Sequence, residues 1–187
     1  MRVAMPRLIS RQKDPYWDGF INRPPFDANN LVPPAIRAAA DGQVFPGKAE
    51  THTPEVMAEH IKVLGRFFGA DLVGIAQPDR NGDTDYPFAI VCAIRSEHDP
   101  RSSPGIGGQA AVLTGAYVTF NIAAAIREFG FHATRSGELD SERLAESAGL
   151  GSLDSEGRLV TREFGRKVYF ADVIRTDLPL TPDTGQG

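Results

Sequence analysis

The sequence predicts an α+β fold in which helices flank a mixed or antiparallel sheet. Apolar residues recur at helical spacing in residues 54–68 and again in 109–129. Shorter apolar runs at 71–76 and 86–95, and others in the last third of the chain, are typical of strands. Because these elements do not alternate strictly as strand and helix, the order is not that of a doubly wound parallel sheet.

Length, charge and composition are those of an ordinary globular domain. The chain has 187 residues, a formal net charge of −4 and 41% hydrophobic residues, enough for one domain with a sizeable core. The acidic balance gives no electrostatic reason to expect nucleic acid as a ligand. No apolar run approaches the roughly 20 residues of a membrane span, and the N-terminus lacks the apolar region of a signal peptide. We therefore expect a cytoplasmic protein without a membrane span.

Residues 1–50 are rich in proline, which favours extended conformations. This stretch also carries apolar side chains that do not suit a free tail: Trp17, Phe20, Ile21 and Phe26. We expect an extended arm with one short helix near residues 35–40, lying on its own domain or along a partner in a homo- or hetero-oligomer. The domain itself is expected at 51–183, followed by a loose tail at 184–187.

The domain opens with a clear helix signal. Thr53 suits the N-cap, Pro54 suits the first helical position and Gly69 suits the C-terminal end. After the strand at 71–76, an Asn-Gly-Asp turn at 81–83 leads into the longer strand at 86–95. The nearly continuous apolar character of that second strand predicts a central place in the sheet.

Cys92, the single cysteine, lies in the second strand. One cysteine excludes an intrachain disulfide and an iron–sulfur cluster held by four cysteines of this chain. Its apolar neighbours predict a small core residue. No metal site is predicted, since His60 has no second histidine at His-x-x-x-His spacing.

A loop at 96–108 is expected before the long helix at 109–129. The loop is glycine-rich but lacks the lysine and the serine or threonine of a phosphate-binding P-loop. The helix is rich in small residues and sets Tyr117 and Asn121 in apolar surroundings. A tyrosine placed in this way either finds a hydrogen-bond partner in the core or acts as a proton donor beside a ligand. A short strand at 131–135 follows.

The segment from 140 to 180 is the most distinctive part of the chain. It opens with a helix, Glu142 to Ala148, capped by Asp140 or Ser141, and strands are expected at 157–161 and 167–175, joined by a Phe164–Gly165 turn.

Four glycines interrupt this segment: Gly149, Gly151, Gly157 and Gly165. Glycine permits positive φ and close approach of another surface to the backbone. We interpret residues 149–166 as a platform, here called the glycine platform, whose backbone and arginines could press against a large flat or anionic ligand.

Four segments together resemble a known family. They are GRFFGADLVGIA (65–76), YPFAIVCAI (86–94), GAYVTFNIAAAIREFGFHA (115–133) and AGLGSLDSEGRLVTREFGRKVYFADVIRTDLPLTPD (148–183). In order and spacing they resemble the corrinoid-binding domain of the reductive dehalogenases and, more distantly, the epoxyqueuosine reductases. The resemblance covers roughly residues 54–183 and implies a nitroreductase-like α+β core that holds base-off cobalamin beneath the substrate.

The resemblance also implies roles for individual residues. A tyrosine of the family donates a proton to the dehalogenated carbon with the help of a basic residue, and Tyr117 lies in the matching helix. Arg135, Arg158 or Arg166 would be the basic helper. The residues expected to contact the cofactor are Asn121, Gly149, Leu150, Gly151, Phe164, Gly165 and Arg166.

The sequence departs from the family in ways that bear on activity. In the family, two cysteine-rich motifs for [4Fe–4S] clusters follow the segment that matches Leu178-Pro179-Leu180, and these 187 residues contain no such motif. Electrons would therefore have to come from an electron-transfer or iron–sulfur partner protein, or from a reductant. The Gly-Trp-x-Gly-Lys run and the general-acid aspartate expected of epoxyqueuosine reductases are also missing, which argues against a tRNA-modifying enzyme.

Three hypotheses follow. The first is a reductive dehalogenase-like corrinoid-binding protein or subunit that uses an external electron donor. The second is a flavin-dependent enzyme on the same nitroreductase-like core. The third is a cofactor-free subunit that binds a partner through its N-terminal arm.

Overall fold

The computed structural model describes residues 28–78, 85–103 and 105–184. The elements in chain order are α2 (Ala28–Ala38), α3 (Pro54–Phe68), β1 (Leu72–Ala76), β2 (Phe88–Arg95), α4 (Ile106–Glu128), β3 (Ala133–Ser136), α5 (Ser141–Ser147), β4 (Gly151–Leu153), β5 (Leu159–Thr161), β6 (Val168–Phe170) and β7 (Val173–Thr176).

Strand β2 is the centre of the main sheet. The order of the sheet is β1-β2-β7-β3, and β6 also pairs with β2. β1 pairs along one edge of β2, with Val73 opposite Cys92, while β6 and β7 pair with successive halves of its other edge. All of these pairings are antiparallel, so the predicted α+β class with an antiparallel sheet is confirmed, as is the central place of β2.

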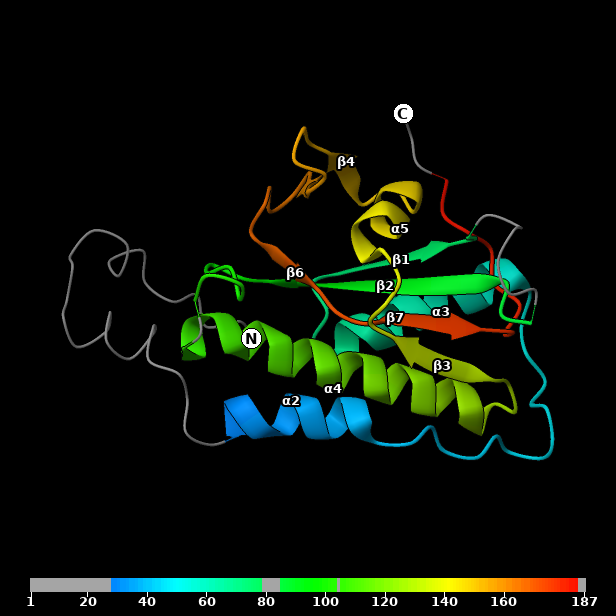
Figure 1. Cartoon of the computed structure of the whole chain (residues 1–187). Coiled ribbons are helices and arrows are strands. Elements are labelled where there is room, and N and C mark those ends of the chain that lie inside the picture. The colour runs from blue at the N-terminus through cyan, green and yellow to red at the C-terminus, as the bar shows by residue number, and fades with distance from the viewer. Residues whose placement is uncertain (1–27, 79–84, 104, 185–187) are drawn as a thin grey trace.

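Helices cover both faces of this sheet (Figure 1). α3 and α4 lie on one face, and α2 packs against the outside of α4. α5 and the small two-stranded sheet β4–β5 lie on the opposite face, where α5 contacts β1 and β2. The main sheet therefore separates α4 from the region that contains the glycine platform.

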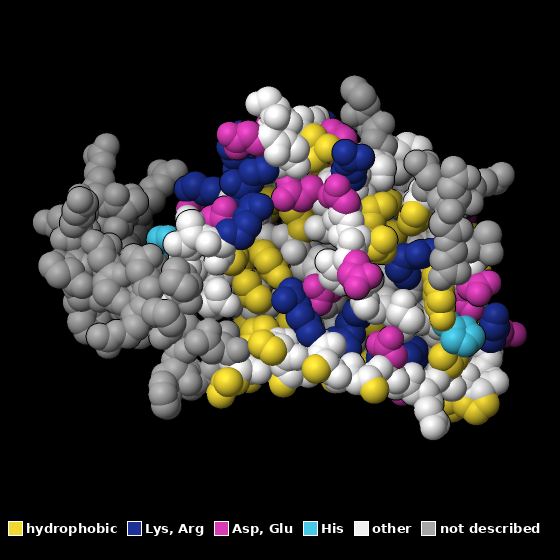
Figure 2. Space-filling view, viewed as in Figure 1, with side chains coloured by type: hydrophobic (Ala, Val, Ile, Leu, Met, Phe, Trp, Pro, Cys, Tyr) yellow, Lys and Arg dark blue, Asp and Glu magenta, His cyan; other side chains and the backbone are white. Residues whose placement is uncertain are grey.

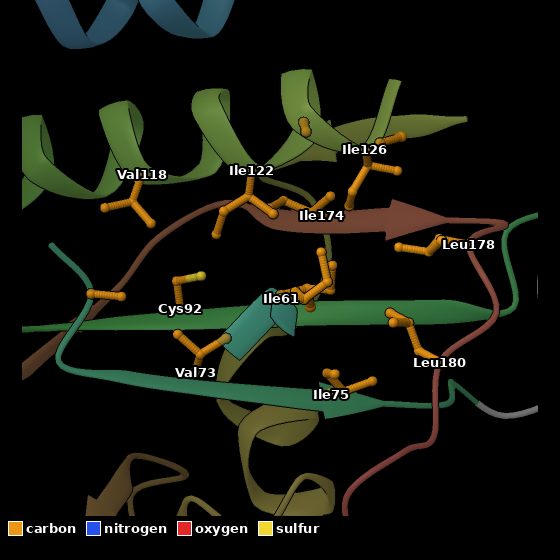
Figure 3. Close-up of a cluster of buried hydrophobic side chains, with 14 of the residues drawn as sticks. Ile61, Val73, Ile75, Cys92, Val118, Ile122, Ile126, Ile174, Leu178 and Leu180 are labelled. Atoms are coloured by element: carbon orange, nitrogen blue, oxygen red, sulfur yellow. The ribbon is translucent and has the colours of Figure 1, made fainter. Parts of the chain in front are cut away.

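The larger core fills the space between α3, α4 and the sheet (Figure 3). Side chains from six elements and from the segment after β7 meet there, among them Ile61, Ile75, Ile122, Ile174 and Leu178, each no more than 1% exposed. Cys92 lies among them and is fully buried, which confirms the prediction of a core residue. Burial raises the pKa of its thiol to about 12, because a thiolate would lose its hydration there.

The ends of the long helices follow the predicted signals. α3 begins directly after Thr53 with Pro54 in its first turn, and it ends at Gly69 in the left-handed conformation, with φ of 117°. Gly130, with φ of 84°, follows the end of α4. Such φ values carry a steric penalty for residues with a Cβ, so the glycines help set where these helices stop.

Two expectations for the boundaries were wrong. α4 begins at Ile106 and so includes the last residues of the predicted loop; a Cβ on Gly108 would lie 2.2 Å from the carbonyl oxygen of Ser103. Only glycine permits the loop to pass so close to the first turn of the helix.

The second error concerns the C-terminal strands. The residues 157–161 and 167–175 do not form two strands joined by one turn. β5 pairs with β4 in a separate sheet, and the later run divides into β6 and β7, both paired with β2. Leu159 on the buried side of β5 packs with Ala145 of α5 and Val91 of β2, so long-range packing decided the pairing.

The short helix expected near residues 35–40 is present but begins earlier, at Ala28, with Pro33 and Pro34 inside it. Packing against α4 stabilises α2 despite the prolines. The remaining residues of the predicted arm, 1–27, and the predicted turn at 81–83 lie outside the described residues, so the domain limits stay predictions.

In the described part of the chain, α4 is the one helix long and apolar enough to cross a membrane by length and composition. The expectation that no apolar segment has this length therefore needs correction. α4 contacts α2, α3 and four strands, which is the environment of a core helix, and such helices pass the same test.

We predict that Gly74→Ala destabilises the protein. A Cβ at this position in β1 would lie 2.8 Å from the Cβ of Ala148 and 3.0 Å from Leu150, and overpacking of this kind costs about 1–3 kcal/mol. Urea unfolding followed by circular dichroism measures the change. Gly47→Ala is the matched control, since its Cβ would meet only a ring atom of Phe45 at 3.6 Å; equal stability of the two variants would contradict this packing.

We also predict that Cys92 in the folded protein resists maleimide labelling. Its complete burial and raised pKa leave almost no accessible thiolate at neutral pH. Mass spectrometry should show rapid modification in denaturing urea and almost none in buffer. Comparable rates under the two conditions would place Cys92 at an accessible surface.

Candidate functional site

The predicted site residues occupy three separate places. Tyr117 and Asn121 lie on α4, Arg135 lies on β3, and the residues from Gly149 to Arg166 lie on the far side of the sheet with α5 (Figure 1). The structure therefore brings the glycine platform together but does not place Tyr117 beside it.

Tyr117 is half exposed and points away from the sheet. Its ring stands edge-on to that of Phe68 at a centroid distance of 6.3 Å. Asn121, one turn further along α4, donates through its side-chain amide to the carbonyl oxygen of Tyr117 at 2.7 Å. The two residues thus share one outward stripe of α4, next to the end of α3.

Arg135 acts as a structural cap. Its guanidinium donates to the carbonyl oxygens of Ile36 and Ala39 at 2.8 and 2.9 Å and lies over the ring of Phe120. These contacts satisfy carbonyl groups at the C-terminal end of α2, where a positive charge is favourable. The side chain is only 6% exposed, so it is committed to holding α2 in place.

The first half of the glycine platform is built by close packing. Gly149 leaves α5 with φ of 71°, and Leu150 then packs over Gly74 of β1. A Cβ on Gly151 would lie 2.3 Å from the carbonyl oxygen of Val160, so this glycine allows β4 and β5 to pair. These residues shape the platform from within.

The second half presents open backbone. Phe164 and Gly165 form a turn in which Gly165 exchanges backbone hydrogen bonds with Thr161 at 2.9 and 3.0 Å. Gly165 has φ of 58° and Gly157 has φ of 73°, and a Cβ on either would meet nothing within 4 Å. The backbone at both turns is therefore accessible to a ligand, and the Phe164 ring lies below the guanidinium of Arg95.

Two of the three platform arginines are already paired with carboxylates. Arg158 forms an ion pair with Asp99 at 3.0 Å, and Arg166 forms ion pairs with Asp154 at 2.6 Å and with Glu156 at 3.1 Å. The hydrogen bond from the Arg158 backbone is the main cause of the lowered pKa of Asp154. Figure 2 shows basic and acidic side chains intermingled over this corner of the molecule.

This charge balance bears on the chemistry of a ligand. Partial burial opposes ionisation of Asp99, but bonds from Arg101 and the charges of Arg101 and Arg158 lower its pKa overall. These carboxylates are thus ionised at neutral pH and hold the arginines. With Arg158 and Arg166 held in this way, the platform has less free positive charge to offer a phosphate.

A second polar cluster joins α2 to β6, and the sequence analysis missed it. The hydroxyl of Tyr169 accepts a hydrogen bond from Arg37 at 2.7 Å, and the Nε of Arg37 donates to Asp172 at 2.9 Å. Gly115 makes room on α4, since a Cβ there would lie 3.0 Å from the Tyr169 ring. We call Arg37, Tyr169 and Asp172 the Tyr169 cluster.

The cluster keeps a protonated tyrosine next to a cation. Burial, with a smaller contribution from Asp172, raises the pKa of Tyr169, while Arg37 opposes the rise. The hydroxyl is therefore a proton donor at neutral pH. The arginine and the tyrosine are 132 residues apart in the sequence, so no local spacing could have indicated their contact.

In the described part of the chain, no group of three or more histidine, cysteine, aspartate or glutamate side chains is arranged to hold a metal ion.

Sequence comparisons alone find no relative. No family model matches the chain, and no curated protein matches it.

Comparison of structures does find relatives. The catabolic reductive dehalogenase NpRdhA matches with a TM-score of 0.72 and 25% identity, over 85% of this chain and 24% of that chain. A reductive dehalogenase whose structure "suggests a mechanism for B12-dependent dehalogenation" matches with a TM-score of 0.68, with the same identity and coverage. The expected resemblance to the reductive dehalogenases is confirmed. The chain spans about a quarter of the length of these dehalogenases.

The more distant resemblance is confirmed at the level of the fold. Epoxyqueuosine reductase from Streptococcus thermophilus matches with a TM-score of 0.55 and 15% identity, over 69% of this chain and 48% of that chain. The two groups of structures thus share the fold of this chain.

We predict opposite effects of two substitutions on the pKa of Tyr169. Arg37→Gln removes a charge that favours the phenolate, so the pKa should rise further. Asp172→Asn removes a negative charge that disfavours the phenolate, so the pKa should fall. Ultraviolet titration of tyrosinate, with Tyr169→Phe as the reference that isolates this residue, measures both; shifts of the same sign would contradict the geometry of the Tyr169 cluster.

Proposed function

We propose that this chain is a reductive dehalogenase-like, corrinoid-binding protein or subunit. The observation that carries the proposal is the structural match over 85% of the chain to reductive dehalogenases, one of them described as B12-dependent. The match covers about a quarter of those dehalogenase chains. The proposal therefore concerns the corrinoid-binding part of such an enzyme.

The glycine platform is the surface we assign to the corrin. The unobstructed turn at Gly165 and the partly buried ring of Phe164 leave room for a large, flat molecule to lie against this surface. Gly149, Leu150 and Gly151 set the shape of this surface, and Arg166 would contribute through its stem and its amide, since its guanidinium is held by two carboxylates. When bound, cobalamin would supply the reducing centre for cleavage of a carbon–halogen bond.

The proton donor has two candidates. Replacement of a halide by hydrogen consumes an electron pair and a proton and releases the halide ion. Tyr117 is the candidate from the family resemblance, but among its three proposed helpers Arg135 is committed to α2, and Arg158 and Arg166 lie across the sheet. Tyr169 already has a basic partner in Arg37, but its ring packs against Gly115 of α4, so it too lies across the sheet from the glycine platform. Both candidates therefore lie on the α4 side, and Tyr169 is the one with a basic partner among the described residues.

The electrons are proposed to come from outside these 187 residues. A single, fully buried cysteine cannot hold a four-cysteine iron–sulfur cluster. An iron–sulfur or flavin electron-transfer protein is the class of donor that the proposed reaction needs, and a chemical reductant can replace it in vitro.

We predict that the protein mixed with hydroxocobalamin emerges from gel filtration with a bound corrinoid and a base-off absorbance spectrum. Gly165→Asn should weaken binding by roughly tenfold or more, or about 1.4 kcal/mol, because it adds a side chain to the open turn. Gly69→Asn is the matched control: Gly69 also has positive φ, an added Cβ would come no closer than 3.4 Å to Thr114, and it lies at the end of α3 on the opposite face of the sheet, so this variant should bind like the parent protein.

Three results would contradict the proposal. They are a colourless protein after gel filtration, a preparation that carries flavin absorbance, and equal weakening by the two asparagine substitutions, which would point to general loss of structure.

A further inference from the structure

The outward face of α4 is apolar but only partly buried by the rest of the described structure. α4 carries few charges, yet only half of the residues in its most apolar 18-residue stretch are buried in the structure. Ala110 and Tyr117 on this face are exposed, and Leu113 and Ala124 are partly so. A helix that is apolar all round is normally enclosed on all sides, which indicates that something further covers it.

The neighbouring end of α3 extends this apolar surface. Phe67 is 79% exposed and Val63 is 58% exposed, whereas the partly buried ring of Phe68 contacts Tyr117. Gly69 at the end of α3 lies against Thr114 of α4, so the two exposed stripes are continuous. We call Val63, Phe67, Leu113 and Tyr117 the α3–α4 surface. Such a contiguous patch of large apolar side chains is typical of an interaction site.

We infer that residues 14–27 of the same chain cover the α3–α4 surface. This segment leads directly into α2, which runs beside the N-terminal half of α4 (Figure 1). It carries four large apolar side chains at short intervals: Trp17, Phe20, Ile21 and Phe26. The α3–α4 surface and the segment proposed to cover it are therefore both apolar, and the segment is joined in sequence to a helix that packs on α4.

The length of the segment suffices. An extended chain covers about 3.3 Å per residue, so Phe20 can lie up to roughly 26 Å from Ala28, more than twice the width of a helix with its side chains. The charges of the two parts are also complementary. Asp18 follows Trp17 in the segment, and the exposed Arg66 precedes Phe67 on the α3–α4 surface. The inference concerns the outside of α4 and does not rest on the proposed cofactor site.

Trp17 provides a specific test because it is the single tryptophan of the chain. In the full-length protein its fluorescence should be blue-shifted and protected from acrylamide. The double variant Val63→Gln/Phe67→Gln should shift the emission to longer wavelength and raise the quenching constant at least about twofold, because the segment loses its apolar contacts. Both replaced side chains are largely exposed, so the fold should persist by far-ultraviolet circular dichroism.

Val160→Gln is the matched control. Val160 is also an exposed apolar residue, 38% accessible, but it lies on β5 across the sheet, and its replacement should leave Trp17 unchanged. Emission typical of water in the parent protein, or an emission unaffected by the α3 double variant, would overturn the inference. Emission that changes on dilution would also overturn it, by showing that a second copy of the chain supplies the cover.

Discussion

Burial of β2 on both faces is the constraint on which the rest of the structure depends. Residues 89–93 of this strand are 0% exposed. A strand with no solvated face needs a layer above it and another below it. α3 and α4 supply the first, and α5 with the β4–β5 sheet supplies the second. The same requirement divides the molecule functionally, because it places the outward stripe of α4 and the glycine platform on opposite sides.

The parts of the fold with local signals could be predicted from the sequence. Pro54 directly after Thr53, Gly69 at the end of the helix and the unbroken apolar run around Cys92 predicted α3 and β2 to within two residues, although the Thr53 side chain makes no capping hydrogen bond. The pairing of β5 with β4 could not be predicted, because the local sequence equally allows β5 to pair with the strand that follows it. The packing of β5 against Ala145 and Val91 decides the pairing. The start of α2 was misplaced because two prolines obscure a helix that exists through contact with α4.

The candidate site shows the same limit. The turns of the platform could be predicted because glycine in the sequence marks positions where the backbone can take positive φ. Three of the four platform glycines have positive φ. The ion pairs of the arginines could not be predicted, because a carboxylate partner can be distant in the sequence, as Asp99 is from Arg158. Likewise the contact of Arg37 with Tyr169 depends on α2 docking beside β6. The result is a surface on which two of the three arginines, Arg158 and Arg166, are already paired with carboxylates.

The most direct test of the central claim is amide hydrogen exchange of the protein with and without hydroxocobalamin. Binding at the glycine platform should slow exchange in peptides that cover residues 149–151 and 164–166, and should leave the exposed C-terminal half of α3 unchanged. Protection confined to α3 and α4, or no protection at saturating cobalamin, would contradict the assignment of this surface to a corrinoid.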